Sequence, residues 1–189
     1  MSTDVHAHLL LPAMHAEVER RVPGLVAEAA ALELRRNGPA SLAASGAMIG
    51  ARIPRLTDVG ARLAAMDEQG IDRQWVSVSP NHFYPWAPEG LAVWLAMETN
   101  RLVAEHVAQA PDRLVGLGVV PLAHPSRIVE YLDDAVLGRG LAGVEQLAAD
   151  VGQRQAGFVQ AVSAHAHKIE RAAEVSQGAR GRRGCVPGH

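Results

Sequence analysis

Hydrophobic residues along the first 147 positions recur with two different periods, which predicts that strands and helices alternate. Short apolar runs predict four strands, at residues 4–11, 74–79, 114–120 and 141–147. Apolar residues three or four positions apart predict three helices, at residues 58–70, 88–109 and 125–138. Asp58 is expected to cap the first of these helices and Gly70 to end it. The second is expected to bury a stripe made of Leu91, Trp94, Leu95, Leu102 and Val107.

A segment with a less regular pattern separates the first strand from this series. Residues 16–36 are helix-like, and residues 37–54, rich in Gly, Ala, Ser and Pro, are expected to form a loop. Long loops in compact domains are often functional, so Arg52 and Arg55 are candidates for binding an anionic substrate. The alternative is a surface insertion without chemistry.

The order of the elements predicts an α/β fold with a parallel sheet and right-handed crossovers. Two architectures fit this order, an open doubly wound sheet and a (β/α)8 barrel. No glycine-rich phosphate loop follows a predicted strand, and Gly116 and Gly118 lie inside one. The sequence therefore gives no support to a dinucleotide site.

The first strand carries the residues with the clearest chemistry. Side chains two positions apart on a strand point to the same face, so Asp4, His6 and His8 are expected to form one polar row. Two adjacent imidazoles supply half of a metal site, and catalytic zinc usually takes three protein ligands and a water. At least one further ligand must come from elsewhere in the chain. A coincidental His-x-His is the alternative, but a metal-binding first strand favours the barrel.

The loop after the second predicted strand is the other candidate for a functional segment. In a barrel, the active face is built from the loops that follow the strands. Residues 81–86 concentrate aromatic side chains in a chain that is only 4% aromatic. His82 and Trp86 are therefore candidates for substrate contacts, with a packed lid that has no chemistry as the alternative.

Composition narrows the class of protein without identifying it. The 189 residues are 48% apolar with a net charge of −2, as expected of a globular protein with a sizeable core. This charge gives no case for nucleic acid, and no apolar run reaches the ~20 residues that a membrane helix needs. Cys185 has no second cysteine to pair with, and the N-terminus does not match a signal peptide. A cytoplasmic location is expected.

Four blocks of sequence together resemble the amidohydrolase-related family. Within it they are most similar to the branch that contains α-amino-β-carboxymuconate-ε-semialdehyde decarboxylase. The resemblance covers about residues 4–147, and the blocks that carry it are residues 4–8, 62–72, 111–122 and 140–145.

The resemblance implies a metal-dependent (β/α)8 barrel in which His6 and His8 bind a divalent ion, usually zinc. It also implies decarboxylation or hydrolysis of small carboxylated, often aromatic-derived compounds. An Arg in the loop after the first strand holds a carboxylate in the family, and Arg52 or Arg55 matches that position. Asp4 is expected to orient the two imidazoles or to add a hydrogen bond.

The sequence departs from the family after about residue 150. The family's later metal-ligand His, catalytic His and Asp have no matching motif here, and a complete barrel typically needs ~250 residues. Residues 1–150 contain 12 basic and 18 acidic residues, whereas residues 151–189 contain 6 and 2. We expect the first half of a barrel, inactive alone, followed by a basic tail that is frameshifted, disordered or helical. A native tail that binds an acidic partner is the alternative.

Two further hypotheses follow from this reading. His165 and His167 repeat the His-x-His spacing, but their surroundings are helix-like, where such positions point to nearly opposite sides. They are not expected to chelate one ion together. A half-barrel also leaves strand edges unpaired, so a non-catalytic interaction protein that forms homo-oligomers is the alternative function.

Overall fold

The computed structural model describes residues 1–145 apart from residues 83, 85–86 and 122–126. Its elements, in chain order, are β1 (Thr3–Leu9), α1 (Pro12–Arg21), α2 (Leu25–Asn37), α3 (Pro39–Gly50), α4 (Ile53–Thr57), α5 (Val59–Glu68), β2 (Arg73–Val78), the 3-10 turn η1 (Pro80–His82), α6 (Glu89–Val107), β3 (Leu114–Gly118), α7 (Ile128–Asp133), the π-helical turn η3 (Asp134–Gly138) and β4 (Gly143–Val144). The predicted tail at residues 151–189 and Trp86 lie outside the described residues.

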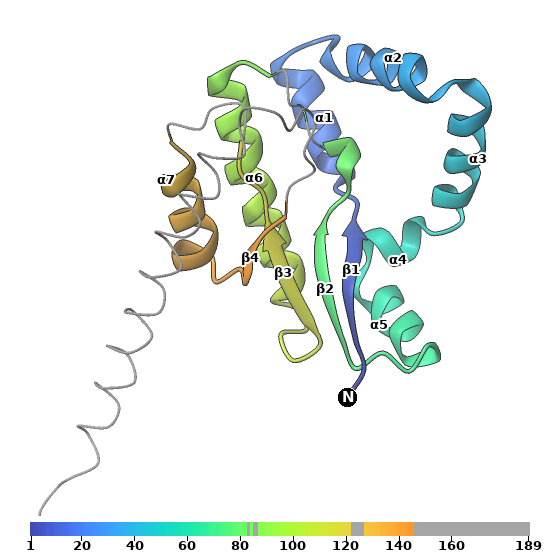
Figure 1. Ribbon diagram of the computed structural model, residues 1–189, viewed down its shortest axis with the longest axis vertical. Coiled ribbons are helices and arrows are strands. Elements are labelled where there is room, and N and C mark those ends of the chain that lie inside the picture. Colours follow the sequence, from blue (N-terminus) through green and yellow to red (C-terminus); the bar gives the residue numbers. More distant parts are fainter. Residues whose placement is uncertain (83, 85–86, 122–126, 146–189) are drawn as a thin grey trace, which may run out of the picture.

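The four strands form one parallel sheet in the order β1-β2-β3-β4 (Figure 1). Each strand is added beside the preceding one, whereas a doubly wound sheet reverses its order at a switch point. Sequential addition is the arrangement of a (β/α)8 barrel. The predicted α/β fold and its first-half barrel architecture are therefore confirmed.

The sheet is rolled toward the face that carries the histidines. In a flat sheet β1 and β4 would lie three strand spacings apart, or about 14 Å. Nδ1 of His6 on β1 nevertheless lies 3.5 Å from Oε1 of Glu145, directly after β4. The backbone N–H of Glu145 still donates to the carbonyl of Gly118 on β3, at 2.8 Å. The curvature thus brings side chains from the first and fourth strands together.

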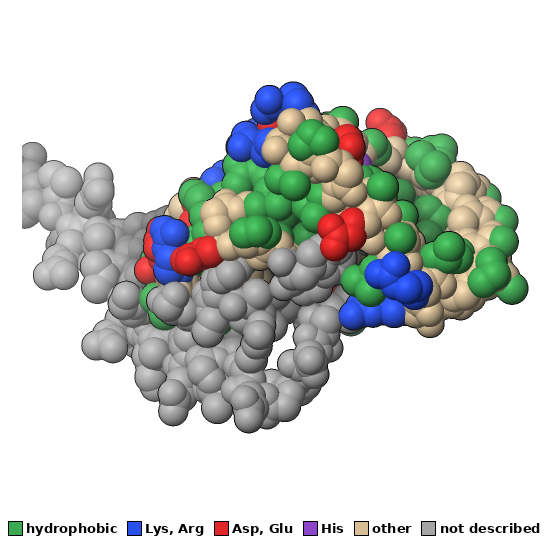
Figure 2. Space-filling view, turned by 90° about the horizontal axis from the view of Figure 1, so that it is seen from above, with side chains coloured by type: hydrophobic (Ala, Val, Ile, Leu, Met, Phe, Trp, Pro, Cys, Tyr) green, Lys and Arg blue, Asp and Glu red, His purple; other side chains and the backbone are tan. Residues whose placement is uncertain are grey.

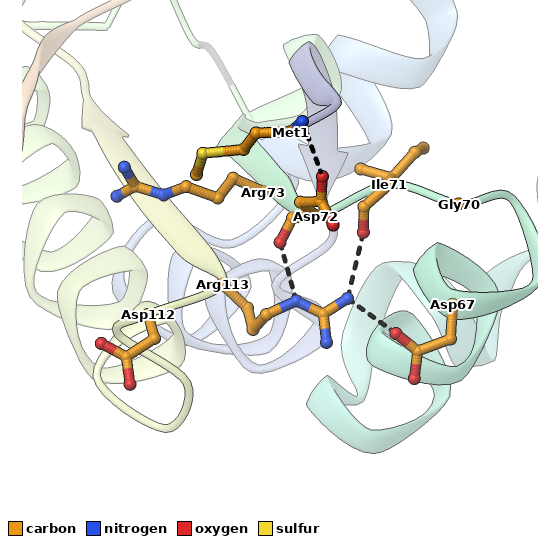
Figure 3. Close-up of a pocket in the computed structure, with 8 residues that line it drawn as sticks. All are labelled: Met1, Asp67, Gly70, Ile71, Asp72, Arg73, Asp112 and Arg113. Carbon is orange, nitrogen blue, oxygen red and sulfur yellow. Dashed lines mark hydrogen bonds and ion pairs between the residues drawn. The ribbon is translucent and has the colours of Figure 1, made fainter.

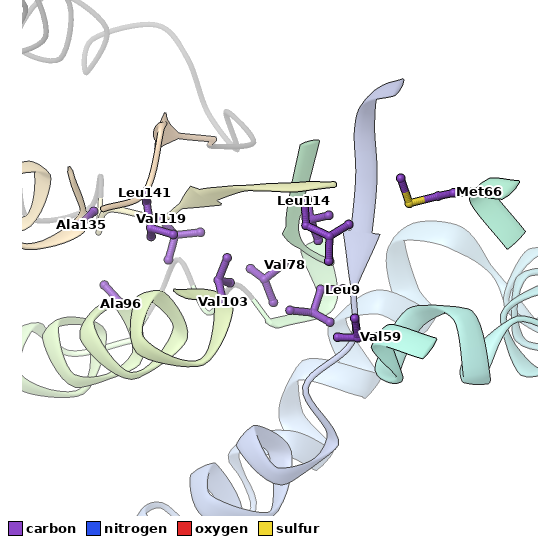
Figure 4. Close-up of a cluster of buried hydrophobic side chains, with 11 residues drawn as sticks. Leu9, Val59, Met66, Val78, Ala96, Val103, Leu114, Val119, Ala135 and Leu141 are labelled. Carbon is purple, nitrogen blue, oxygen red and sulfur yellow. The ribbon is translucent and has the colours of Figure 1, made fainter. Parts of the chain in front are cut away.

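The main core lies between the other face of the sheet and the helices α5 and α6 (Figure 4). Leu9, Val76 and Val78 from the strands pack there with Met66 and Val103 from the helices. This burial of aliphatic side chains is the main stabilising contribution to the half-barrel.

The two glycines of β3 allow this core to pack closely. A Cβ atom at Gly116 would lie 2.6 Å from Cδ2 of Leu141 and 3.2 Å from side-chain atoms of Val103 and Val107. A Cβ atom at Gly118 would lie 2.8 Å from Oδ1 of Asn100. These glycines therefore serve close packing inside the strand.

Local signals set the ends of α5 as predicted. The carboxylate of Asp58 accepts a hydrogen bond from the N–H of Ala61 at 2.7 Å, which is the geometry of an N-cap. Gly70 has a φ of +66°, a left-handed conformation that glycine adopts without strain.

The predicted loop at residues 37–54 is wrong, because most of it is helical. Pro39 lies in the first turn of α3 and Pro54 in the first turn of α4, where proline's missing N–H costs nothing. The helix-like segment 16–36 is two helices, divided near Gly24, which has a φ of +89°. In Figure 1, α2 and α3 form an arm that leaves the sheet and returns through α4. None of the twelve residues of α3, all of them described, is buried.

The buried stripe of α6 also differs from the prediction. Leu95 is buried as expected, but Leu91, Trp94 and Leu102 are only partly buried in a second cluster with α1. The fully buried positions are instead Ala92, Leu95, Ala96, Thr99, Asn100, Val103 and His106.

No helix in the described part of the chain is long and apolar enough to cross a membrane.

Candidate metal centre

His6 and His8 are neighbours on the inner face of the rolled sheet. Their ring centroids lie 4.7 Å apart with the planes at 77°, an edge-to-face arrangement. The His6 side chain is exposed, and His8 is partly buried. The imidazoles are thus close enough to contact the same ligand.

A bulge in β1 changes the relation of Asp4 to these histidines. Asp4 pairs with Gln74 on β2, but the next pair is Ala7 with Val76, so β1 contains one extra residue. Asp4 therefore lies on the helix-covered face beside Gln74, whereas His8 pairs with Ser77 and faces the other way. The prediction that Asp4 shares a face with the histidines is wrong. Asp4 instead contacts the backbone, where its Oδ1 accepts a hydrogen bond from the N–H of His6 at 3.1 Å.

Glu145 is a third polar residue beside the histidines, and the sequence reasoning missed it. Its carboxylate lies 3.5 Å from His6, and its side chain is 26% exposed. The signal was present in the sequence, because Glu145 is the first charged residue after the start of the fourth predicted strand. The carboxyl ends of parallel barrel strands meet at one face, so such a residue belongs near the site.

The electrostatics at His8 favour neutral imidazole, the form that binds metals. Burial lowers the pKa of His8, neighbouring His6 and Arg62 lower it further, and the Glu145 carboxylate acts in the opposite direction. Nδ1 of His8 is buried and has no hydrogen-bond partner among the described residues. Two imidazoles and a carboxylate are a donor set that suits zinc or manganese.

The described residues do not by themselves complete a metal site. Within them, no three His, Cys, Asp or Glu side chains are already arranged as ligands around one point. His6, His8 and Glu145 therefore offer part of a donor set. A bound ion would take its remaining ligands from other groups or from water.

The structure does not place Arg52 and Arg55 in contact with the histidines. Both belong to the short helical segment at α4, which is anchored to β1 by a hydrogen bond from the N–H of Leu10 to the carbonyl of Leu56. The guanidinium of Arg55 lies 3.6 Å from the carboxylate of Glu68, at the end of α5. Arg52 is exposed and makes no ion pair among the described residues.

His82 has a structural position that the sequence did not predict. It is only 3% exposed, and its Nε2 accepts a hydrogen bond from the N–H of Leu11 at 3.0 Å. Its ring stacks on His15 with 4.4 Å between centroids, and Nδ1 of His15 lies 3.0 Å from the hydroxyl of Tyr84. The expected substrate contact is not supported, because the ring is buried and its acceptor nitrogen holds the chain that leaves β1.

The buried histidines His82, in this cluster, and His106, on α6, predict that acid destabilises the fold. Burial and the neighbouring His15 lower the pKa of His82 to about 3, and burial lowers the pKa of His106 to about 4. Between pH 6.5 and these pKa values, the unfolded chain binds protons that the folded chain does not. The free energy of unfolding therefore decreases as the pH is lowered, by up to about 1.4 kcal/mol per pH unit for each histidine. We expect urea midpoints to fall from pH 7 to pH 5, and to fall less in His82→Gln. An equal fall in both proteins would contradict this assignment.

A cavity of about 620 Å³ lies at the opposite, amino end of the strands (Figure 3). Nε of Arg113 donates to the carbonyl of Asp72 at 2.7 Å, and its Nη2 donates to the Asp67 carboxylate at 2.7 Å and to the carbonyl of Ile71 at 3.0 Å. The carboxylate of Asp72 accepts in turn from the N–H of Ser2. These contacts tie the amino ends of the strands together, far along the sheet from Glu145.

Comparison with known proteins extends the likeness over most of the chain. The amidohydrolase family profile matches residues 3–174, so the match ends within the predicted tail. The chain is 30% identical over 88 residues to 2-amino-3-carboxymuconate-6-semialdehyde decarboxylase of Dictyostelium discoideum, covering 47% of this chain and 24% of that protein. It is 29% identical over 129 residues to the protein of that name in Caenorhabditis elegans, covering 67% and 31%. The chain thus matches less than a third of each curated relative's length.

Solved structures with the same fold include two decarboxylases. A 5-carboxyvanillate decarboxylase from Novosphingobium aromaticivorans, with manganese and 4-hydroxy-3-methoxy-5-nitrobenzoic acid, has a TM-score of 0.63 and 19% identity, over 86% of this chain and 47% of that one. A dihydroxybenzoic acid decarboxylase from Polaromonas sp. JS666, with manganese and the inhibitor 2-nitroresorcinol, has a TM-score of 0.56 and 20% identity, over 86% and 46%. At these identities the likeness establishes the fold alone.

Proposed function

The chain belongs to the amidohydrolase family, and from this premise we propose that it carries the metal-binding first half of a decarboxylase site. The observation that carries the proposal is the contact between the His6 and His8 rings on the inner face of the sheet, with the Glu145 carboxylate beside them. His6 and His8 would hold a divalent ion there. A bound ion supplies Lewis-acid polarisation of the substrate or activates a water.

The proposed substrate is a small carboxylated compound derived from an aromatic ring. The names of the curated relatives and of the two solved structures support this class, because each is a decarboxylase of a carboxylated substrate. Hydrolysis is the other reaction type that we predicted from the family. Figure 2 views the end of the molecule toward which β1 points, where hydrophobic side chains cover much of the described face and both Arg and acidic side chains lie among them.

Of the two candidate arginines, we assign the substrate carboxylate to Arg52. Arg55 already has the carboxylate of Glu68 as a partner, whereas Arg52 makes no ion pair within the described part of the chain. Trp86 stays a predicted substrate contact, since it lies outside the described residues. Zinc is the metal predicted from the family. Manganese is the second ion to test, because both solved structures contain it.

We further propose that this chain binds metal but has little or no turnover alone. The described residues provide four strands of the eight in a complete barrel, and they contribute two imidazoles and one carboxylate to the site. The frameshift at the start of the tail stays a prediction, and translation of the gene beyond codon 145 in all three frames tests it.

The experiment is metal uptake by the purified 189-residue chain. Protein dialysed against Zn²⁺ or Mn²⁺ is expected to retain about one ion per chain, and incubation with 2,6-dihydroxybenzoate is expected to release no CO2 above the metal-free level. Failure to retain either ion would overturn the metal-centre proposal. If the chain instead self-associates without metal, the interaction protein with unpaired strand edges is the better reading. Chelator-sensitive CO2 release would overturn only the predicted inactivity.

A further inference from the structure

A chain of polar side chains lies on the opposite face of β1, directly behind the histidines, and it is buried at Arg62 and Gln74 and partly exposed at Asp4. Nη1 of Arg62 on α5 donates to Oε1 of Gln74 at 2.7 Å, and Nε2 of Gln74 donates to Oδ2 of Asp4 at 2.9 Å. The two ends of this chain reach the backbone of the metal-binding segment. Asp4 accepts from the N–H of His6 at 3.1 Å, and Nη2 of Arg62 donates to the carbonyl of His8 at 2.8 Å.

These bonds act where the strand ladder is interrupted. Val5 and His6 have no register partner on β2, because the bulge falls between Asp4 and Ala7. A bulge leaves a residue outside the regular pairing, so its backbone groups need other partners. The side chain of Asp4 supplies that partner for His6.

The bulge also decides which face Asp4 occupies relative to the imidazoles. With an unbroken period of two, Asp4, His6 and His8 would share one face. The extra residue lets Asp4 face α5 while His8 faces the inside of the barrel. The polar chain therefore acts on the conformation that brings the two rings to 4.7 Å.

Arg62 is well suited to such a role. Its side chain is 4% exposed, so its guanidinium has few alternative partners and is held between three elements, α5, β1 and β2. Its guanidinium is positively charged at neutral pH, as in any arginine. Hydrogen bonds from a charged donor are stronger than those between neutral groups.

We propose that Arg62, Gln74 and Asp4 are positioning residues that fix the bulge of β1 and thereby the spacing of the two metal-binding imidazoles. This inference rests on the proposed metal centre, because the spacing matters only if an ion is bound. The backbone part of the proposal is independent of metal and is tested separately.

The first measurement is the dissociation constant for Co²⁺, followed by the visible absorption of the bound ion. Arg62→Met is expected to weaken binding by about 10- to 100-fold, the usual cost of losing a group that orients a ligand. Arg62→Lys, which keeps the charge and one donor, should recover part of the loss. The matched control is Arg127→Met, which removes an exposed arginine that is hydrogen-bonded to Glu130 on α7, away from β1. That variant should change binding by less than about twofold, as expected away from the site.

The second measurement is amide hydrogen exchange at His6 in metal-free protein. Asp4→Ala is expected to speed exchange of this N–H by at least tenfold, because it removes the acceptor of the His6 N–H. Arg127→Met should leave the exchange rate at His6 unchanged. If Arg62→Met proves unfolded, Asp4→Ala supplies both readouts. Equal Co²⁺ affinity in Asp4→Ala and the wild type, or unchanged exchange at His6, would overturn the positioning role. If the wild type binds no Co²⁺, the metal centre fails, and exchange still decides whether Asp4 holds the bulge.

Discussion

Replacing His6 and His8 together with alanine is expected to lower Zn²⁺ affinity by about four orders of magnitude. Zinc bound by four protein ligands gains about 10–16 kcal/mol, so each ligand contributes roughly 3 kcal/mol, or about a hundredfold in affinity. The two rings are adjacent, and no described group beyond Glu145 is placed to replace them. Competition titration against a chromophoric chelator measures the loss.

The matched control changes two histidines with the same spacing. His165 and His167 lie outside the described residues, and their helix-like surroundings predict that they do not chelate an ion together. Their double replacement with alanine should leave Zn²⁺ affinity unchanged. If this variant lost its zinc and the His6 and His8 variant kept it, the assignment of the metal centre to β1 would be wrong.

Much of the fold could be predicted because the signals for it are local. The alternation of short apolar runs with helical spacing depends on residues within one element, and it gave the parallel α/β order. Asp58 and Gly70 act within a single turn, so the ends of α5 follow from their chemistry alone. The closeness of His6 and His8 was also expected, since two positions on one strand are enough to suggest it.

The features that sequence reasoning missed depend on residues far apart in the chain. The bulge of β1 is held by Gln74 and Arg62, and nothing in residues 4–8 reveals these partners. Glu145 meets His6 only because four strands roll into a curve. On α6 the prediction followed the large apolar residues, whereas close packing on Gly118 selects the polar Asn100. The error at residues 37–54 was of another kind, because Gly and Pro there divide helices instead of preventing them.

Asn100→Ala is expected to destabilise the chain by about 3 kcal/mol, since each buried group left without a partner costs about 1–3 kcal/mol. Asn100 is 1% exposed, its Oδ1 accepts from the N–H of Val119 at 2.7 Å, and its Nδ2 donates to the carbonyl of Val119 at 3.0 Å. Val119 directly follows the end of β3 and is itself buried. Alanine at position 100 would therefore leave both the N–H and the carbonyl of Val119 unpaired. Such a loss is a large share of the 5–15 kcal/mol that typically holds a domain together.

Urea unfolding measures this effect as a lower midpoint with an unchanged slope. Asn100→Asp keeps the acceptor but buries a carboxylate against the carbonyl of Val119, so it should destabilise the chain at least as much as Asn100→Ala. Gln109→Ala is the matched control just beyond the same helix, because the Gln109 amide makes one exposed hydrogen bond, to the carbonyl of Glu105 at 3.3 Å. Its midpoint should stay near that of the wild type. An equal shift in Asn100→Ala and Gln109→Ala would mean that the end of β3 finds its hydrogen bonds elsewhere, and that Asn100 does not hold the strand at the edge where the site is built.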